Sequence, residues 1–254
     1  MQNTTRIYLL SFISFLIGTA EYIIAGILDK IAQDLALSVQ AVGQMITVFS
    51  IAFAVGTPIV ITLTSGADRK KLLIGFMAIF SLINLVTIGL TSYGWLNVSR
   101  AISGLSAGVV EVILLTLAAT LAAPGKKAGA IAMVIIGFSA ALVVGVPLGR
   151  MISNTMNWRF IFVGLGILTL ISLVLVSYLI PSTQGEKAVP LIDQIKILKN
   201  KNISIVYTIT FFWISAFSII LLLYFTVSFT GFAYDKQRNQ HHVTGFRVSQ
   251  HRRL

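Results

Sequence analysis

Two glutamates and one arginine lie inside long apolar stretches of this sequence. Of the eight acids, only Glu21 and Glu111 are within apolar runs, and Arg100 is the one basic residue well inside such a run. A charge at the centre of a bilayer costs at least about 2.5–3.5 kcal/mol, so these residues usually face a cavity or a partner. A carboxyl group changes its proton affinity when it moves between a low-dielectric cavity and the neighbourhood of an arginine. Proton binding and release is therefore one role for Glu21 or Glu111; a fixed ion pair that holds two helices together is the alternative for Glu21 and Arg100.

The sequence has seven apolar runs, two of which contain these residues, and the runs predict membrane-spanning helices. Of the 254 residues, 56% are hydrophobic and 11% are charged, whereas soluble domains carry about 25% charged residues. A spanning helix needs roughly 20 apolar residues, and an isolated span must satisfy its own backbone hydrogen bonds. The expected spans are residues 7–28, 39–64, 72–90, 95–121, 128–153, 158–180 and 203–228.

The three charged residues have predictable depths. With the N-terminus inside, the first span runs outward and the fourth runs inward. Glu21 and Arg100 therefore both lie roughly 8–10 Å below the outer surface. We expect these two residues to approach each other. Glu111 lies about 16 Å further along the helix than Arg100, which excludes a tight contact between them.

The spans form a two-part plan. We expect a six-helix bundle over residues 1–180, a cytoplasmic linker over 181–202, a seventh helix over 203–228 and a basic, disordered tail over 229–254. With the N-terminus inside, ten lysines and arginines lie on the inner side and three on the outer side. Because basic residues favour the cytoplasmic side, this distribution predicts a multi-pass plasma-membrane protein with a cytoplasmic N-terminus.

Composition also excludes several functions. The chain has no cysteine, and its three histidines all lie in the tail. No span therefore offers a thiolate or imidazole, and we expect neither an enzyme nor a metal or cofactor site. A zinc site in the tail is the alternative to an out-of-frame end of a truncated gene. The formal charge of +11 reflects membrane topology, so no nucleic-acid partner is expected.

An internal repeat links the two halves of the bundle at an offset of about 90 residues. Gly18-Thr19-Ala20-Glu21 matches Gly108-Val109-Val110-Glu111, and Gly56-Thr57-Pro58 matches Gly145-Val146-Pro147. Each repeat holds three helices, an odd number, so the second copy is inverted in the membrane. Nested inverted repeats are typical of secondary transporters, whose sites lie at the repeat interface.

Span 128–153 carries small residues at helix-packing spacing around a proline. Its Gly145-Val146-Pro147-Leu148-Gly149 segment resembles the antiporter signature of the major facilitator superfamily. Small residues allow close helix contact, and proline bends the helix.

Span 95–121 carries a second motif of the same kind. Arg100-x-x-x-Gly104-x-x-x-Gly108 resembles the fourth-helix motif of that superfamily, whose arginine is linked to proton transfer. Asn157-Trp158-Arg159, at the start of the next span but one, is similar to the family as well.

The connection before span 72–90 resembles the family's gating motif, G-x-x-x-D-R-x-G-R-R. Here it reads Asp68-Arg69-Lys70-Lys71 after Ser65-Gly66-Ala67. Aligned on Asp-Arg, Lys71 replaces the second glycine; aligned on the basic end, the aspartate is lost. The resemblance implies a cytoplasmic gating loop, and the alternative is that Asp68 only balances the basic cluster.

The sequence around Glu21, Gly-Thr-Ala-Glu-Tyr, resembles the drug:proton antiporter and sugar-efflux-like branch. The resemblance covers about residues 6–228 and implies one six-helix bundle of a twelve-helix, all-α membrane protein, followed by an isolated seventh helix. It also implies proton-coupled efflux of small molecules such as drugs or sugars, with the lipid bilayer, protons and substrate as partners. The alternative is a truncated, non-transporting membrane fragment or an assembly partner for another half-transporter.

Overall fold

The computed structural model describes residues 2–183, 196, 200–216 and 219–220. Within these residues every regular element is helical, and none is a strand. The expectation of an all-α membrane protein is confirmed. The chain divides into two compact units, 1–194 and 195–254. The predicted tail and most of the predicted linker lie outside the described residues.

Six helices of the first unit are long and apolar enough to cross a membrane. This number matches the predicted bundle. We call them spans one to six in chain order. Their bounds are Asn3–Gly26, Val39–Leu63, Arg69–Gly89, Tyr93–Leu121, Lys127–Thr155 and Arg159–Leu179.

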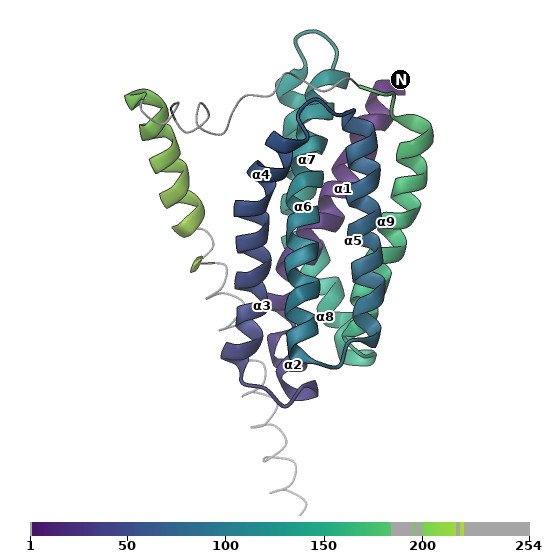
Figure 1. The fold of residues 1–254 in the computed structure, drawn as a ribbon, viewed down its shortest axis with the longest axis vertical. Helices are drawn as coiled ribbons and strands as arrows, with labels where there is room; N and C mark the ends of the chain where they lie inside the picture. Colours follow the sequence, from purple (N-terminus) through teal and green to yellow (C-terminus); the bar gives the residue numbers. More distant parts are fainter. Residues whose placement is uncertain (1, 184–195, 197–199, 217–218, 221–254) are drawn as a thin grey trace, which may run out of the picture. The chain divides into compact units, whose positions relative to one another are not determined.

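These spans are built from the helices labelled in Figure 1. Side-chain caps begin two of them, since the Ser38 hydroxyl accepts a hydrogen bond from the Ala41 N–H and Asp68 accepts from the first turn of span three. Such caps satisfy N–H groups that have no partner within the helix. The helices and helical segments are α1 (Gln2–Gly26), α2 (Leu28–Asp34), α3 (Val39–Ile51), η1 (Ala52–Gly56), α4 (Thr57–Leu63), α5 (Arg69–Val86), η2 (Thr87–Gly89), α6 (Tyr93–Leu121), α7 (Lys127–Ala140), η3 (Ala141–Gly145), α8 (Val146–Thr155) and α9 (Arg159–Leu179).

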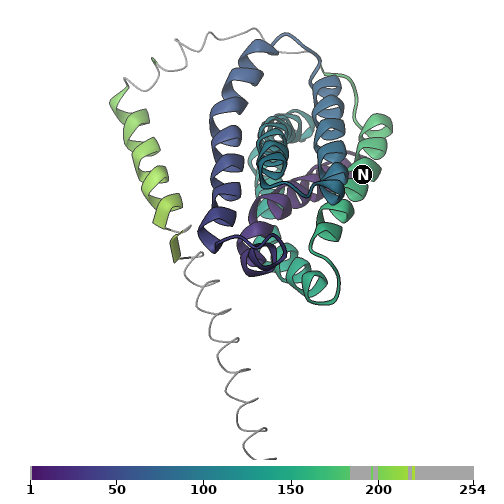
Figure 2. The ribbon, with the colours of Figure 1, turned by 60° about the horizontal axis from the view of Figure 1, so that its bottom comes forward.

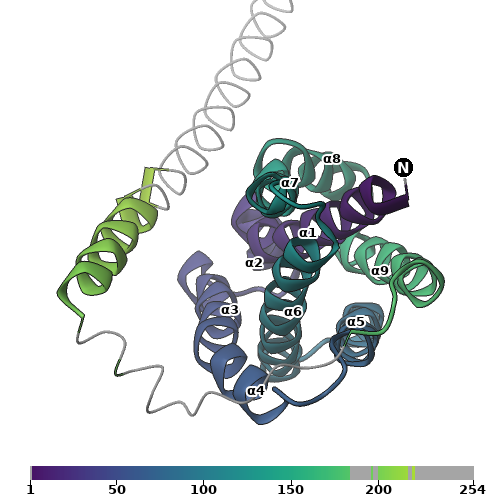
Figure 3. The same cartoon turned by 90° about the horizontal axis from the view of Figure 1, so that it is seen from above.

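Helices α1 and α6 form the centre of the bundle. Of their apolar stretches, 56% and 67% of residues are buried, against at most 39% in the other spans. Seen from above, α1 and α6 lie between α3–α4 on one side and α7–α8 on the other, with α5 and α9 beside them (Figure 3). Figure 2 shows the same grouping from an intermediate direction. The buried charges of spans one and four are therefore carried by the two most enclosed helices.

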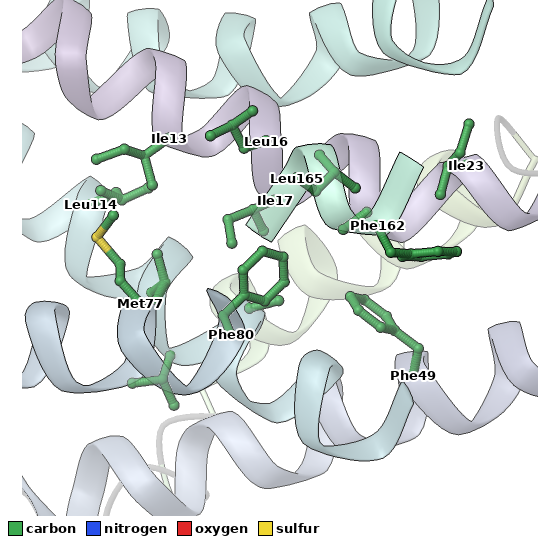
Figure 4. Packing of buried hydrophobic residues seen from close by; sticks show 14 of the residues in the cluster. Ile13, Leu16, Ile17, Ile23, Phe49, Met77, Phe80, Leu114, Phe162 and Leu165 are labelled. Atoms are coloured by element: carbon green, nitrogen blue, oxygen red, sulfur yellow. The ribbon is translucent and has the colours of Figure 1, made fainter. Parts of the chain in front are cut away.

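The core between these helices is apolar. Phe49, Phe80 and Phe162 are its largest fully buried side chains, and they pack among leucines and isoleucines of α1 and α9 (Figure 4). Lipid is as apolar as this core, so close packing rather than water exclusion favours the assembly of the helices.

Spans two and five change their helical winding at matching places. The π-helical segments η1 and η3 lie in the middle of these spans, and each is followed by an α-helix with proline in its first turn, at Pro58 and Pro147. Proline has no N–H to donate, so a wider turn before it accommodates the interrupted ladder. The structure thus repeats a local feature of the predicted internal repeat, and the helical winding of both spans changes where the sequence places Gly-x-Pro.

The connection between spans one and two is partly helical. Helix α2 occupies it, with Ile31 fully buried beneath. The chain leaves α2 through Ala36 at φ 52°, a left-handed turn residue. Apolar residues inside a polar segment were the signal for this helix.

The described residues of the second unit include a helix over 201–216, with helical residues again at 219–220. This helix falls within the predicted seventh span, and its apolar side chains are exposed. Residues 217–218 and 221–228 of that span lie outside the described residues.

Candidate functional site

Arg100 lies deep in the bundle on α6 and is 3% exposed. Its Nη2 donates a 2.9 Å hydrogen bond to the main-chain oxygen of Ala20 on α1. Its guanidinium carbon lies 4.4 Å from the ring centre of Phe49 and 5.7 Å from that of Phe162. A cation over an aromatic face is stabilised by the ring's quadrupole, more so when both are desolvated. Arg100 is therefore held by a backbone oxygen and two rings.

Glu21 follows Ala20 and lies near Arg100 without pairing with it. The two charges attract each other, but the ion pairs among the described residues do not include this one. The Oε2 atom of Glu21 is buried and accepts no hydrogen bond from the described residues. The structure thus brings the two residues into electrostatic range, with one carboxyl oxygen of Glu21 left without a donor.

Glu111 is bound to span one by a different contact. The Ser14 hydroxyl on α1 donates a 2.8 Å hydrogen bond to its Oε1, while its Oε2 is buried and has no donor among the described residues. Glu111 lies within electrostatic range of Glu21. The three predicted residues therefore lie along the α1–α6 interface. Each of the two acids has one buried oxygen without a donor.

Glycines permit the close approach of the helices around this interface. A Cβ at Gly104 would overlap the Phe49 main-chain carbonyl, and one at Gly108 would overlap the Thr57 hydroxyl. Span five shows the same relation to span one, because a Cβ at Gly145 or Gly149 would overlap Thr19 or Ile23. The glycines of both predicted motifs thus lie at helix crossings, span four on span two and span five on span one.

The loop predicted to gate the cytoplasmic side is docked on the end of span six. Asp68 accepts hydrogen bonds from the N–H groups of Lys70 and Lys71, at 2.8 and 3.1 Å. The Lys70 ammonium donates a 2.7 Å bond to the main-chain oxygen of Ser177. Arg69 is buried. Asp68 therefore acts here as a helix cap, a role that neither sequence alternative considered.

The start of span six mirrors this loop at the opposite end. The Asn157 side chain accepts a 2.9 Å bond from the Arg159 N–H, as Asp68 does from Lys70. Arg159 Nη2 donates a 3.3 Å bond to the main-chain oxygen of Leu90, at the end of span three. Spans three and six thus cap each other's last carbonyls with a basic residue, as expected for two antiparallel copies of one unit.

Two ion pairs join α2 to the end of span five and to the start of span six. Arg150 donates hydrogen bonds to both carboxylate oxygens of Asp29. Asp34 pairs with Arg159 and accepts a 3.0 Å bond from the Trp158 indole. Burial raises the pKa of Asp29, but the hydrogen bonds and charge of Arg150 outweigh it and hold the pKa below its ordinary value. The pKa of Asp34 is lowered in the same way, with the bonds from Arg159 and Trp158 outweighing burial.

This arrangement can hold charge inside the membrane, but the described residues offer no group of three or more ligands suited to a metal ion. The inverted repeat, the buried charges between α1 and α6 and the matching π-helical segments before Pro58 and Pro147 point to one group of membrane proteins. The family model of the Major Facilitator Superfamily matches residues 10–248. The chain belongs to the major facilitator superfamily.

Relatives within the superfamily agree with this assignment. The uncharacterized MFS-type transporter YbcL of Bacillus subtilis (strain 168) is 43% identical over 219 residues, which cover 86% of this chain and 56% of that protein. The uncharacterized MFS-type transporter YtbD of the same organism is 34% identical over 210 residues, covering 82% and 53%. The chain spans about half the length of these curated relatives.

A solved structure shares the superfamily fold. The inward-open xylose transporter XylE from E. coli matches with a TM-score of 0.58 and 18% identity, over 71% of this chain and 49% of that chain. At this identity the likeness supports the fold alone.

Several contacts of this superfamily member were not predicted from its sequence. These contacts join segments that are far apart in the chain. They are the contact of Arg100 with Phe49 and the pairs of Asp29 with Arg150 and of Asp34 with Arg159. The repeat offset places Phe138 at 89 residues after Phe49, but this pattern does not indicate that Phe49 lies against Arg100.

Proposed function

We propose that this chain is part of a proton-coupled exporter of small molecules, located in the plasma membrane with its N-terminus in the cytoplasm. The observation that carries this proposal is the incomplete hydrogen bonding of the buried charges. Arg100 bonds to Ala20 through Nη2 and lies over Phe49, but its Nε and Nη1 have no acceptor, and Glu21 and Glu111 each keep a buried oxygen without a donor among the described residues.

Such carboxyl groups are suited to binding and releasing protons. A proton on Glu21 or Glu111 cancels a charge that lacks a full set of partners, and entry of water favours its release. Because Arg100 does not depend on Glu21 for its position, Glu21 can change its protonation state while the arginine stays in place. Rocking of the bundle would then present the carboxyl groups to one side of the membrane at a time.

The substrate class follows from resemblance and not from a pocket in this chain. The sequence around Glu21 resembles drug:proton antiporters and sugar-efflux-like proteins, so a drug, sugar or similar small molecule is the proposed cargo. A second six-helix bundle, in the same protein or in another half-transporter, is the proposed partner because the curated relatives are about twice as long. No cofactor is needed for this mechanism.

Proton movement in proteoliposomes tests the proposal. A pH-sensitive dye inside vesicles holding the purified chain would report protons that move when candidate small molecules are added. We expect a response that falls at least tenfold in Glu21→Gln and Glu111→Gln and disappears in the double variant. Asp29→Asn, an acid-to-amide change outside the spans, is the matched control and should keep the response. A response that survives in the double variant contradicts proton coupling by these residues, and no response in the wild-type chain contradicts transport by this polypeptide.

A further inference from the structure

A cavity of about 550 Å³ lies at the end of the bundle opposite α2, away from Arg100 and the two glutamates. It lies between the first turns of α1 and the loop that leads into α7, which are at the same end of the bundle in Figure 1. The positions of basic residues predict that this end faces the cytoplasm. The cavity is therefore expected at the level of the inner headgroups.

The polar lining of the cavity consists of one amide, two hydroxyl groups and one cation, and the carbonyl of the amide, Asn3, already accepts a bond from Arg6. Thr4 and Tyr8 contribute hydroxyl groups from α1, and Lys126 contributes an exposed ammonium from the loop. No acid lines the cavity. An anion would therefore meet donors here without meeting a competing carboxylate.

Glycines keep the cavity open. Gly125 turns the chain at φ +77°, and a Cβ built on Gly129 would meet nothing within 4 Å. Both line the cavity. A side chain could thus be added at Gly129 without a clash, and it would occupy space that is now open.

An apolar surface leads from the cavity toward the middle of the membrane. Tyr8 is 59% exposed and Phe12 is 43% exposed. They lie one turn apart on the same face of α1. This surface suits an acyl chain, and an aromatic residue such as Tyr8 is favoured at the headgroup level.

We propose that this cavity binds the phosphate headgroup of an anionic phospholipid of the inner leaflet, with Lys126 as its charged contact. Basic pockets on the cytoplasmic side of helix bundles bind anionic headgroups in this manner. Lys126 and Tyr8 line the cavity, and the exposed Phe12 lies one turn beyond Tyr8 on α1. This arrangement favours a lipid over a free phosphate, because a soluble anion would not use the apolar part. The proposal is independent of what the protein transports.

Retention of lipid by the purified chain tests it. The chain would be titrated with phosphatidylglycerol or phosphatidylcholine in detergent, and bound lipid would be counted by native mass spectrometry. We expect phosphatidylglycerol to bind more tightly. Lys126→Gln should weaken its binding about fivefold, the fold-change for the ~1 kcal/mol that one lysine contributes near an anionic surface. Gly129→Leu should weaken it further by filling the cavity.

Lys127→Gln is the matched control. It removes the same charge from the neighbouring position, which does not line the cavity. It should bind phosphatidylglycerol within twofold of the wild-type chain. Equal weakening in Lys126→Gln and Lys127→Gln would show diffuse surface attraction and overturn the proposal. So would equal retention of the two lipids, or displacement of phosphatidylglycerol by millimolar inorganic phosphate. Unfolding temperatures measured without lipid would show that Gly129→Leu is folded; should it be unfolded, Lys126→Gln alone decides.

Discussion

Arg100 on α6 donates its 2.9 Å hydrogen bond to the main-chain oxygen of Ala20, the residue immediately before Glu21 on α1. The arginine is thereby fixed to the backbone of the helix that carries the acid, and not to the acid itself. Its position also depends on the planar guanidinium, which lies over the ring of Phe49. A lysine would keep the charge and lose this geometry.

We therefore expect Arg100→Lys to lower proton-coupled transport at least tenfold. The chain should still insert, because one positive charge is kept at the same depth. Flux and membrane expression, measured on the same vesicles, check this. Wild-type flux in Arg100→Lys would mean that the charge alone is sufficient.

Substitution of Gly104 should destabilise the bundle. A Cβ added at this position would overlap the Phe49 carbonyl. Relief of this overlap requires a shift of the backbone, which costs free energy of folding. We expect Gly104→Ala to cost about 1–3 kcal/mol of unfolding free energy. Gly75→Ala is the control, because a Cβ there meets nothing within 4 Å; it should be neutral or stabilising by up to about 1 kcal/mol. Thermal unfolding in detergent compares the two variants, and equal stabilities would contradict the tight crossing.

The ion pairs of α2 predict how stability depends on pH. The pKa values of Asp29 and Asp34 are lowered in the folded protein, so their contribution is fully present above the ordinary value of 3.8 and is lost as the pH falls through the lower folded values. The unfolding temperature should thus decrease in acid below about pH 4. The double variant Asp29→Asn, Asp34→Asn should show a smaller decrease over the same range. An unchanged pH profile would show that other groups cause the decrease.

The crossed caps of spans three and six can be tested at the start of span three. Lys70→Met removes the bond to the Ser177 oxygen and should cost about 1 kcal/mol, at the low end for a charged hydrogen bond because Lys70 is half-buried. Lys71→Met changes the same charge on an exposed side chain and should stay within about 0.5 kcal/mol. The difference in unfolding temperature between these variants is the measurement. Similar losses in both would assign the effect to surface charge.

Local sequence was enough for several features of this protein. The lengths of the apolar runs predicted the six spans, since each must cross a bilayer of fixed thickness. The rarity of charge in these runs singled out Glu21, Arg100 and Glu111, since each buried charge is costly. The Gly-x-Pro repeats indicated the internal symmetry, and the matching π-helical segments of spans two and five show it in the backbone.

Only the tertiary structure decided which partners these residues have. The depths predicted from the sequence placed Arg100 near Glu21. In the structure Arg100 instead donates its hydrogen bond to Ala20 and lies over the ring of Phe49. Contacts between helices depend on the rotation and crossing of the helices and not on depth alone. Asp68 is a helix cap, which the sequence pattern did not indicate. Asp29 pairs with Arg150, which lies 121 residues away in the chain. The sequence by itself determined which segments cross the membrane and which charges they carry; the packing of six helices decided which carboxyl oxygens were left unpaired.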